Sequence, residues 1–431
     1  MRTIVLEDNK LQTADRVAHD WYRFVLSFPP HLVRHYLERF GAGESHVVLD
    51  PFSGTGTTLV ECKKLGIESV GIEANPVAFL ASETKTDWRP DPGALTKHAS
   101  RVAELAVSRL EKANIADELF FNCPDPNTLK KLGREQQNLI LARSISPLPL
   151  HKVLVLQECL SEQSDKCYAN HERLSLAKAI VASASNLRFG PEVGVGKVKE
   201  DAAVVGPWLA LMRTMAEDLR LLRDRRHVLT RTVCADARRL RGTLPPNSVD
   251  FVFTSPPYPN EKDYTRTTRL ESVILGFINT RKELRQLKKG LVRSNTRNVY
   301  KNDDDDVMIE NHVRIQRLAT AIEERRKRLG KTSGFEKMYS RVTRLYFGGM
   351  ARHFQELKHV LKPGATLAYV VGDQASYFRV MIRTGELLAD IAQSLGYKLI
   401  GIDTFRTRRA TATGEDLREE VVLLQWKGQR N

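Results

Sequence analysis

A short corner at residues 254–258, Thr-Ser-Pro-Pro-Tyr, combines residue types that could do chemistry. It follows the apolar run VDFVF, which indicates a buried strand. Proline has no N–H for a strand ladder and fixes its own φ, so Pro256 and Pro257 predict a stiff end to that strand. The Ser255 hydroxyl and the Pro256 carbonyl are then outward-facing acceptors, and Tyr258 offers a ring face for stacking. The corner is therefore suited to holding both hydrogens of an amine on a flat ring.

A second stretch, VVLDPFSGTGTTLVE at 47–61, indicates a strand, a glycine turn and a helix in succession. Gly54 and Gly56 let the main chain turn sharply and approach a ligand, which the first N–H groups of the helix can face. Glu73 ends the next predicted strand, roughly 20 residues on, where a carboxylate can accept hydrogen bonds from both hydroxyls of a ribose. Leu59 stands where a dinucleotide motif has its third glycine, so a pyrophosphate is not indicated.

Seven short apolar runs supply the strands that would position these groups. Most are near-continuous, as expected for strands covered on both faces, and helical patterns separate several of them. One such pattern, from 346 onwards, is expected to stop at Pro363-Gly364. The alternation predicts an α/β fold with a doubly wound, seven-stranded, mainly parallel sheet. The last two runs, joined by a polar loop, predict an antiparallel edge hairpin. The runs are 46–52, 69–75, 231–237, 249–255, 366–373, 398–405 and 419–426.

Two stretches that break the alternation are predicted to be largely helical insertions. The first carries amphipathic helix patterns and a looser segment, LRFGPEVGVGKVK, and the second is strongly basic. The acidic run Asp303–Asp306 within the second is expected to be a solvated loop. The predicted organisation is a core in three parts, 1–88 with the cofactor motif, 229–279 with the catalytic motif and 345–431, interrupted by insertions at 89–228 and 280–344.

The segment DPFSGTGT at 50–57 resembles the cofactor motif of S-adenosylmethionine-dependent methyltransferases, in the form common in amino-methyltransferases of nucleic acids. The resemblance implies a Rossmann-like fold and S-adenosylmethionine as cofactor. It implies that Gly54 and Gly56 lie beside its methionine and ribose parts, that Glu73 binds the ribose, and that Asp236 contacts the adenine amino group. The implied cofactor-binding residues are Phe28, Pro29, Asp50, Phe52, Ser53, Gly54, Gly56, Thr57, Glu73 and Asp236.

The corner itself resembles the Asp/Asn/Ser-Pro-Pro-Tyr motif of DNA amino-methyltransferases. The resemblance implies that the first and fourth strands are neighbours, which places the corner beside the cofactor's methyl group. Hydrogen bonds from a base amine to Ser255 and the Pro256 carbonyl would localise its lone pair for attack on that methyl. A base in a duplex must first be flipped out. The implied catalytic residues are Ser255, Pro256, Pro257 and Tyr258, and the serine form, preceded by Thr254, looks most like enzymes that modify the N4 amine of cytosine.

The charge balance favours a polyanionic partner, since the chain carries a net charge of +15 and has a pI near 9.6. Double-stranded DNA is the expected partner, with a cognate restriction endonuclease as a second one in a restriction-modification or phage-defence setting. The basic insertion at 280–344 is the first candidate for DNA recognition, and the insertion at 89–228 the second. The predicted nucleic-acid-binding residues are Arg266, Arg269, Arg281, Arg285, Lys288 and Lys289.

Three other functions stay open on the sequence. An N6-adenine DNA methyltransferase uses related motifs. A tRNA guanine N2-methyltransferase shares the start of the cofactor motif and the order of the two motifs, but usually carries Asp-Pro-Pro-Tyr. A catalytically silent DNA-binding subunit would be expected to lose the glycines or Ser255, which are present.

The five cysteines form no C-x-x-C pair, which argues against a disulfide framework and a cysteine-rich zinc site, and no metal is expected. Ring-carbon methylation of cytosine usually needs a Pro-Cys pair, and the sequence has none. The longest apolar runs are of strand length and the N-terminus resembles no signal peptide, so a cytoplasmic protein without membrane contact is expected.

Overall fold

The computed structural model describes residues 11–23, 27–118, 124–190, 192–260, 262–409, 414 and 416–428. The N-terminal stretch 1–10 and Cys123, both used in the sequence predictions, lie outside the described residues, and so does Glu261 in the segment after the catalytic corner. Within the described part of the chain, no helix has the length and apolar character needed to cross a membrane.

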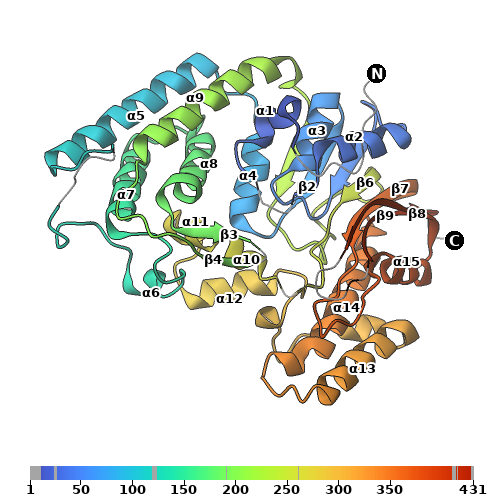
Figure 1. Ribbon diagram of the computed structural model, residues 1–431. Helices are drawn as coiled ribbons and strands as arrows, with labels where there is room; N and C mark the ends of the chain where they lie inside the picture. Colours follow the sequence, from blue (N-terminus) through green and yellow to red (C-terminus); the bar gives the residue numbers. More distant parts are fainter. Residues whose placement is uncertain are drawn as a thin grey trace.

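A seven-stranded sheet forms the centre of the core, and each of its strands overlaps one of the seven predicted runs (Figure 1). Five neighbouring strands run parallel, and the last strand in the chain is antiparallel to both of its neighbours, which confirms the edge hairpin. The strand order is β5-β2-β1-β6-β7-β9-β8. The strands are β1 Val47–Asp50, β2 Glu68–Ile72, β5 Thr230–Val233, β6 Val249–Thr254, β7 Leu361–Gly372, β8 Tyr397–Arg409 and β9 Asp416–Trp426.

Helices cover both faces of this sheet because successive strand side chains point to opposite faces. On β1, Val48 packs into the cluster with α2 (Pro30–Arg39) and α3 (Thr57–Leu65), whereas Leu49 belongs to the cluster on the other face. That second face is covered by α14 (Tyr339–Leu357) and α15 (Thr384–Ser394). The apolar strand runs are therefore buried on both sides, as a doubly wound fold requires.

The helix before β7 differs from the prediction at both ends. α14 begins at Tyr339, several residues before the predicted start, and ends at Leu357 rather than at Pro363. The chain is already extended from Leu361 onwards as β7. A residue that precedes proline disfavours the α conformation, which is consistent with an extended Lys362.

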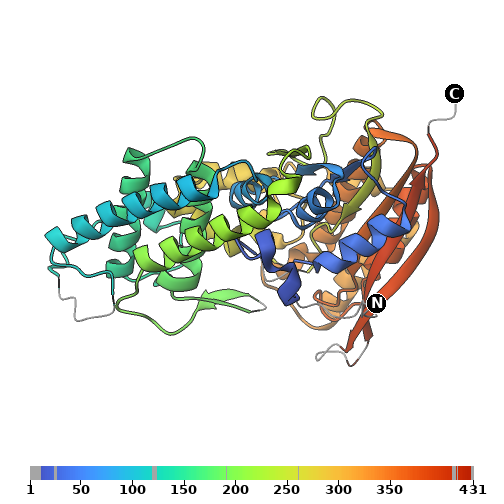
Figure 2. The same cartoon turned by 90° about the horizontal axis from the view of Figure 1, so that it is seen from above.

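The first insertion forms a helical lobe beside the sheet, at the opposite end of the molecule from β8 and β9 (Figure 2). Its apolar core continues into α4 of the catalytic core and into the segment after the catalytic corner, so the lobe and the core share buried surface. The looser segment predicted near 190 contains a short hairpin. The elements of this region are α4 Pro76–Thr86, α5 Pro92–Lys112, α6 Arg134–Gln137, α7 Pro147–Glu162, α8 Ala169–Ala179, β3 Leu187–Phe189, β4 Val193–Val195, α9 Val205–Leu222, α10 Tyr264–Thr267 and α11 Arg269–Ile274.

The basic insertion packs as two parts. Its first helix, α12 (Arg281–Lys289), rests on the apolar core of the helical lobe through Leu284 and Leu287. The η5 turn (Asp305–Ile309) and α13 (Val313–Arg328) instead join the cluster on the α14 face of the sheet. The insertion therefore bridges the helical lobe and the catalytic core.

The expectation of a solvated loop at Asp303–Asp306 is wrong for two of its four residues. Asp305 is 5% exposed and lies 2.9 Å from the Arg352 Nε, and Asp303 accepts two hydrogen bonds from Arg293 at 2.8 and 2.9 Å. A close approach of main chains makes this burial feasible, because a Cβ on Gly348 of α14 would lie 2.0 Å from the Asp305 carbonyl oxygen. The acidic run is thus a docking element of the fold.

Candidate active site

The two chemistry-bearing loops lie side by side because β1 and β6 are adjacent parallel strands. Val48 pairs with Phe251 and Leu49 with Val252. Beyond these pairs the Thr254 hydroxyl donates a 2.6 Å hydrogen bond to the buried Asp50 carboxylate. The glycine turn that follows Asp50 and the corner that follows Thr254 therefore leave the sheet at the same edge. The predicted adjacency of the first and fourth strands is confirmed.

The glycine turn has the backbone shape that the sequence predicts. Gly54 and Gly56 adopt φ of 52° and 81°, in the left-handed region where L side chains are strained. A Cβ on Gly56 would lie 2.8 Å from the Ser82 Oγ and 3.0 Å from its Cα, whereas a Cβ on Gly54 would have only the Phe52 carbonyl oxygen near it, at 4.0 Å. At position 56 both the left-handed φ and the contact with Ser82 therefore require a glycine, whereas Gly54 borders open space.

Gly56→Ala is expected to weaken binding of S-adenosylhomocysteine, the product of the cofactor that the sequence predicts, by tenfold or more, since the turn must shift away from Ser82. Left-handed strain alone costs roughly 1–2 kcal/mol for a residue with a Cβ. The matched control is Gly41→Ala, because Gly41 has a φ of 68° but no atom near its Cβ position. Isothermal titration calorimetry on both variants checks the prediction, and equal affinities would contradict it.

Glu73 lies across from the glycine turn and is tied to it. Its carboxylate accepts hydrogen bonds from the Gly54 N–H at 2.8 Å and the Asn75 N–H at 2.7 Å. Burial raises the pKa of Glu73 to about 7, although these hydrogen bonds oppose the rise. A carboxylate has further lone pairs beyond the two used here, so ligand hydroxyls can still bind.

Asp50 holds a buried acceptor that has no partner among the described residues. Its Oδ1 accepts from Thr254 and, at 3.1 Å, from the Phe52 N–H, but its Oδ2 is unpaired. Burial raises the pKa of Asp50 to about 6, although hydrogen bonds from Thr254, Thr58 and the Phe52 N–H oppose the rise. A buried acceptor without a hydrogen bond lowers the stability of the folded protein, which favours binding of a ligand that can donate a hydrogen bond at this position.

The corner at 254–258, predicted to be catalytic, presents free acceptors, as the two prolines predict. Among the described residues, no hydrogen bond reaches the Ser255 hydroxyl or the Pro256 carbonyl. Tyr258 is fixed on the other side of the corner, since its N–H donates to the Tyr264 hydroxyl at 3.3 Å. Its ring lies beside the end of β7, where a Cβ on Gly372 would be 3.3 Å from the Tyr258 Cε2.

The remaining predicted cofactor residues gather around the same strand ends. Phe28 packs edge-on against Phe253, 5.5 Å between ring centroids, and Pro29 caps α2. Phe52 packs on His353 at 4.9 Å, and Ser53 and Thr57 are buried in the turn and at the start of α3. All these residues therefore border the sheet edge that carries the corner.

Asp236 lies just beyond β5, next to Glu73. The Ala235 N–H donates to the Glu73 carbonyl at 3.3 Å, so the two acids follow neighbouring strand ends. The Asp236 carboxylate is held by Arg238, whose Nε lies 3.0 Å from Oδ1 and whose second amino nitrogen lies 2.7 Å from Oδ2. This carboxylate is oriented by a neighbouring cation before any ligand arrives.

The six basic residues predicted to bind nucleic acid fall into two groups. Arg269 and Lys288 have side chains only 14% and 12% exposed, and Lys288 donates to Asp263 at 2.8 Å. Arg266 is 29% exposed and lies 3.5 Å from Glu192. The exposed group, which lies at four-residue spacing on α12, is Arg281, Arg285 and Lys289.

Three residues of this region were not singled out by the sequence. Lys85 is fully buried in α4 and donates to the Thr55 carbonyl of the glycine turn at 2.7 Å, and burial lowers its pKa to about 7. The other two are Tyr264 and Arg238. For Lys85 the sequence offered one signal, a lysine about one helical turn after the apolar run VAFLA. Tyr264 and Arg238 gave no such signal, because their partners are set by tertiary packing.

Comparisons with known proteins find similarity to a DNA methylase family and to type II methyltransferases. The N6/N4 methyltransferase family, described as DNA methylase, matches residues 5–83. The type II methyltransferase M.BsoBI of Geobacillus stearothermophilus is 26% identical over 416 residues, covering 92% of this chain and 81% of the relative. M.AvaI of Nostoc sp. is 23% identical over 421 residues, covering 88% and 79%. M.MjaII of Methanocaldococcus jannaschii is 41% identical over 68 residues, covering 16% and 12%.

The sheet order and the glycine turn after β1 define a Rossmann-like methyltransferase. Taken with the family match and the two relatives that span most of the chain, they support an S-adenosylmethionine-dependent DNA amino-methyltransferase. The relatives imply S-adenosylmethionine as the methyl donor and DNA as the substrate.

Proposed function

We propose that the protein is a site-specific DNA methyltransferase that methylates the exocyclic N4 amine of a cytosine flipped out of duplex DNA. The observation that supports this most directly is the hydrogen bond between Thr254 and Asp50, because it joins the catalytic corner to the cofactor turn. A stiff acceptor corner beside a nucleoside-binding turn is the arrangement that amine methylation requires.

The residues at the strand ends fit S-adenosylmethionine, which would supply an electrophilic methyl group. The unpaired Asp50 Oδ2 would accept a hydrogen bond from the ammonium of its methionine part. The open space beside Gly54 leaves room for the ligand, and Glu73 would accept from the ribose hydroxyls. Asp236, at the next strand end, would accept from the adenine amine.

The corner would act through position and hydrogen bonds. The Ser255 hydroxyl and the Pro256 carbonyl would each accept a hydrogen bond from the target amine. These two hydrogen bonds would favour a pyramidal nitrogen with a localised lone pair. Tyr258 would stack on the extruded base, and its place beside Gly372 keeps the ring from moving away. No covalent nucleophile is needed in this scheme.

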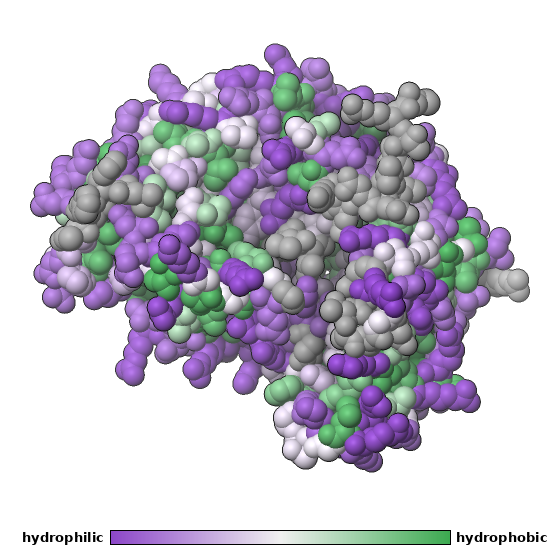
Figure 3. All heavy atoms as spheres, in the orientation of Figure 1, coloured by the Kyte–Doolittle hydropathy of each residue, from purple (hydrophilic) through white to green (hydrophobic). Residues whose placement is uncertain are grey.

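The exposed face of α12 is the proposed site of contact with DNA phosphates. Arg281, Arg285 and Lys289 lie on one side of this helix and are exposed, and hydrophilic side chains cover the lower edge of the helical lobe that carries it (Figure 3). Phosphate contacts of this kind give affinity and orientation, and base contacts must add specificity.

Cytosine N4 is proposed over adenine N6 because Ser255 occupies the position where related motifs carry Asp or Asn. A cytoplasmic location and a cognate restriction endonuclease belong to the same proposal, and the relatives named as type II methyltransferases support that setting.

The test incubates the purified protein with labelled S-adenosylmethionine and plasmid DNA or tRNA, followed by digestion to nucleosides and mass spectrometry. We expect N4-methylcytosine in the plasmid sample, and sequencing of that sample gives the methylated site. N6-methyladenine in the plasmid would show that adenine, not cytosine, is the target base. Label in tRNA alone would show that the substrate is RNA and not DNA. No label in either sample would support a catalytically silent DNA-binding subunit.

A further inference from the structure

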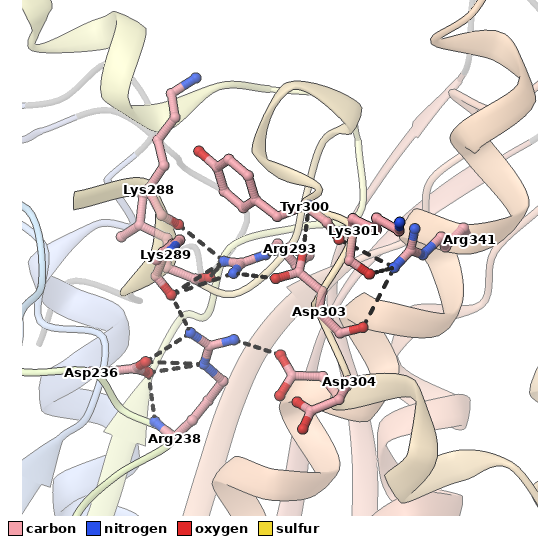
Figure 4. Close-up of polar contacts among 12 residues, drawn as sticks. Asp236, Arg238, Lys288, Lys289, Arg293, Tyr300, Lys301, Asp303, Asp304 and Arg341 are labelled. Carbon is pink, nitrogen blue, oxygen red and sulfur yellow. Dashed lines mark hydrogen bonds and ion pairs between the residues drawn. The ribbon is translucent and has the colours of Figure 1, made fainter. Parts of the chain in front are cut away.

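Arg238 is a buried cation that joins three separate parts of the molecule (Figure 4). One side of its guanidinium binds the Asp236 carboxylate at the cofactor end of β5. Its first amino nitrogen donates to Asp305 at 2.5 Å, and its second also donates to the Lys289 carbonyl at 2.8 Å. The Arg238 side chain therefore contacts the end of β5, the η5 turn and the last residue of α12 at the same time.

The C-terminus of α12 depends on such partners, because the last carbonyls of a helix lack partners within the helix. Arg293, which is 3% exposed, donates to the Lys288 carbonyl at 3.0 Å and also binds Asp303. The two arginines place positive charge where the helix dipole is negative. Both are in turn held by the acidic run, so the helix end cannot move without disturbing Arg238.

The guanidinium groups of Arg238 and Arg293 face three carboxylates in this network, and none of the five side chains is more than 16% exposed. Burial alone would lower the pKa of Arg238, but the hydrogen bonds and charges of Asp236 and Asp305 raise it above its ordinary value. A planar guanidinium can serve three acceptors at fixed angles, whereas a lysine ammonium acts as a point charge. The geometry of the junction therefore requires an arginine.

We propose that Arg238 is a positioning residue that couples the cofactor acid Asp236 to the DNA-facing helix α12. Binding of the cofactor at Asp236 further restricts the motion of this already paired carboxylate and, through Arg238, that of the C-terminus of α12, where Lys289 is one of the exposed cations. By linkage, DNA held by α12 strengthens cofactor binding by the same factor. The inference rests on the proposed function, since it takes Asp236 as a cofactor contact and α12 as a DNA contact.

Hydrogen exchange of the full chain, measured with and without S-adenosylhomocysteine, tests the coupling without any turnover. In the unmodified protein we expect the ligand to slow exchange of amides in 281–289 by roughly fivefold or more. Arg238→Lys should still bind the ligand but lose this difference. Asp305→Asn leaves both the Arg238–Asp236 contact and the Arg238–Lys289 carbonyl contact in place, so it should bind the ligand and keep the difference.

The matched control is Arg109→Lys, which alters a surface pair with Glu162 in the helical lobe and should keep the full difference. A purely structural role for Arg238 would change stability but leave the ligand-dependent difference in 281–289. Ligand binding without slower exchange in the unmodified protein would overturn the coupling alone. Failure of S-adenosylhomocysteine to bind would overturn the proposed function and this inference together.

Discussion

Ser255→Ala is expected to lower turnover by roughly 10²–10³-fold, as removal of one preorganised hydrogen-bonding group does in other enzymes. The Ser255 hydroxyl has no hydrogen bond within the described structure, so its removal breaks no contact of the folded protein. Stability and affinity for S-adenosylhomocysteine should therefore stay unchanged. Methylation kinetics on the plasmid and calorimetric titration of the ligand measure the two effects separately.

The matched control for this variant lies at the other end of the same strand. Ser248 immediately precedes β6, and its hydroxyl donates to the Pro245 carbonyl at 2.7 Å, away from the cofactor edge. Ser248→Ala should keep full turnover. If Ser255→Ala retained the turnover of the unmodified protein, the proposed role of the corner in activating the amine would be wrong.

Gly348→Ala is expected to be the most destabilising of the substitutions considered. Its Cβ would lie 2.0 Å from the Asp305 carbonyl oxygen and 2.4 Å from the Asp305 carbonyl carbon, and a main chain cannot rotate away as a side chain can. Overpacking of this kind costs about 3 kcal/mol or more, which exceeds the gain of about 1 kcal/mol from replacing a helical glycine by alanine. Thermal unfolding should therefore show a midpoint lower by several degrees.

A control at a second helical glycine separates the cost of the steric clash at Gly348 from the gain in helix propensity that alanine brings. A Cβ on Gly206 of α9 would meet its nearest neighbour, the Asp117 Oδ2, at 3.6 Å, which is ordinary contact. Gly206→Ala should leave the unfolding midpoint unchanged or slightly raised. An unaltered midpoint for Gly348→Ala would show that the η5 turn does not dock on α14 as described, and the Arg238 junction would lose its support.

The strands and their ends could be predicted from local sequence because both depend on neighbouring residues. Continuous apolar runs give strands covered on two faces, glycines at Gly54 and Gly56 give the turn, and Pro256 and Pro257 end β6. Parallel strands expose their carboxyl ends at one edge, and the resemblance to methyltransferases implied that the first and fourth strands are neighbours, so one shared site could be predicted.

The partners of charged residues could not be predicted in the same way. The basic sequence around Lys288 and Arg269 predicts that both bind DNA, yet both side chains are largely buried, and Lys288 is paired with Asp263. The acidic run around Asp305 reads as a solvated loop until Arg238 and Arg352 are brought to it from distant parts of the chain. Charge alone does not show whether a side chain faces water or a partner.

The sequence by itself determined the class of fold, the glycine turn and the acceptor corner, since backbone conformation there follows from residue type and short-range pattern. Only the tertiary structure decided that the basic insertion is shared between two apolar clusters and that Asp236 is tied to α12 through Arg238. The Arg238–Asp305 contact alone joins residues 67 positions apart in the chain, and the formation of such contacts depends on how whole elements pack.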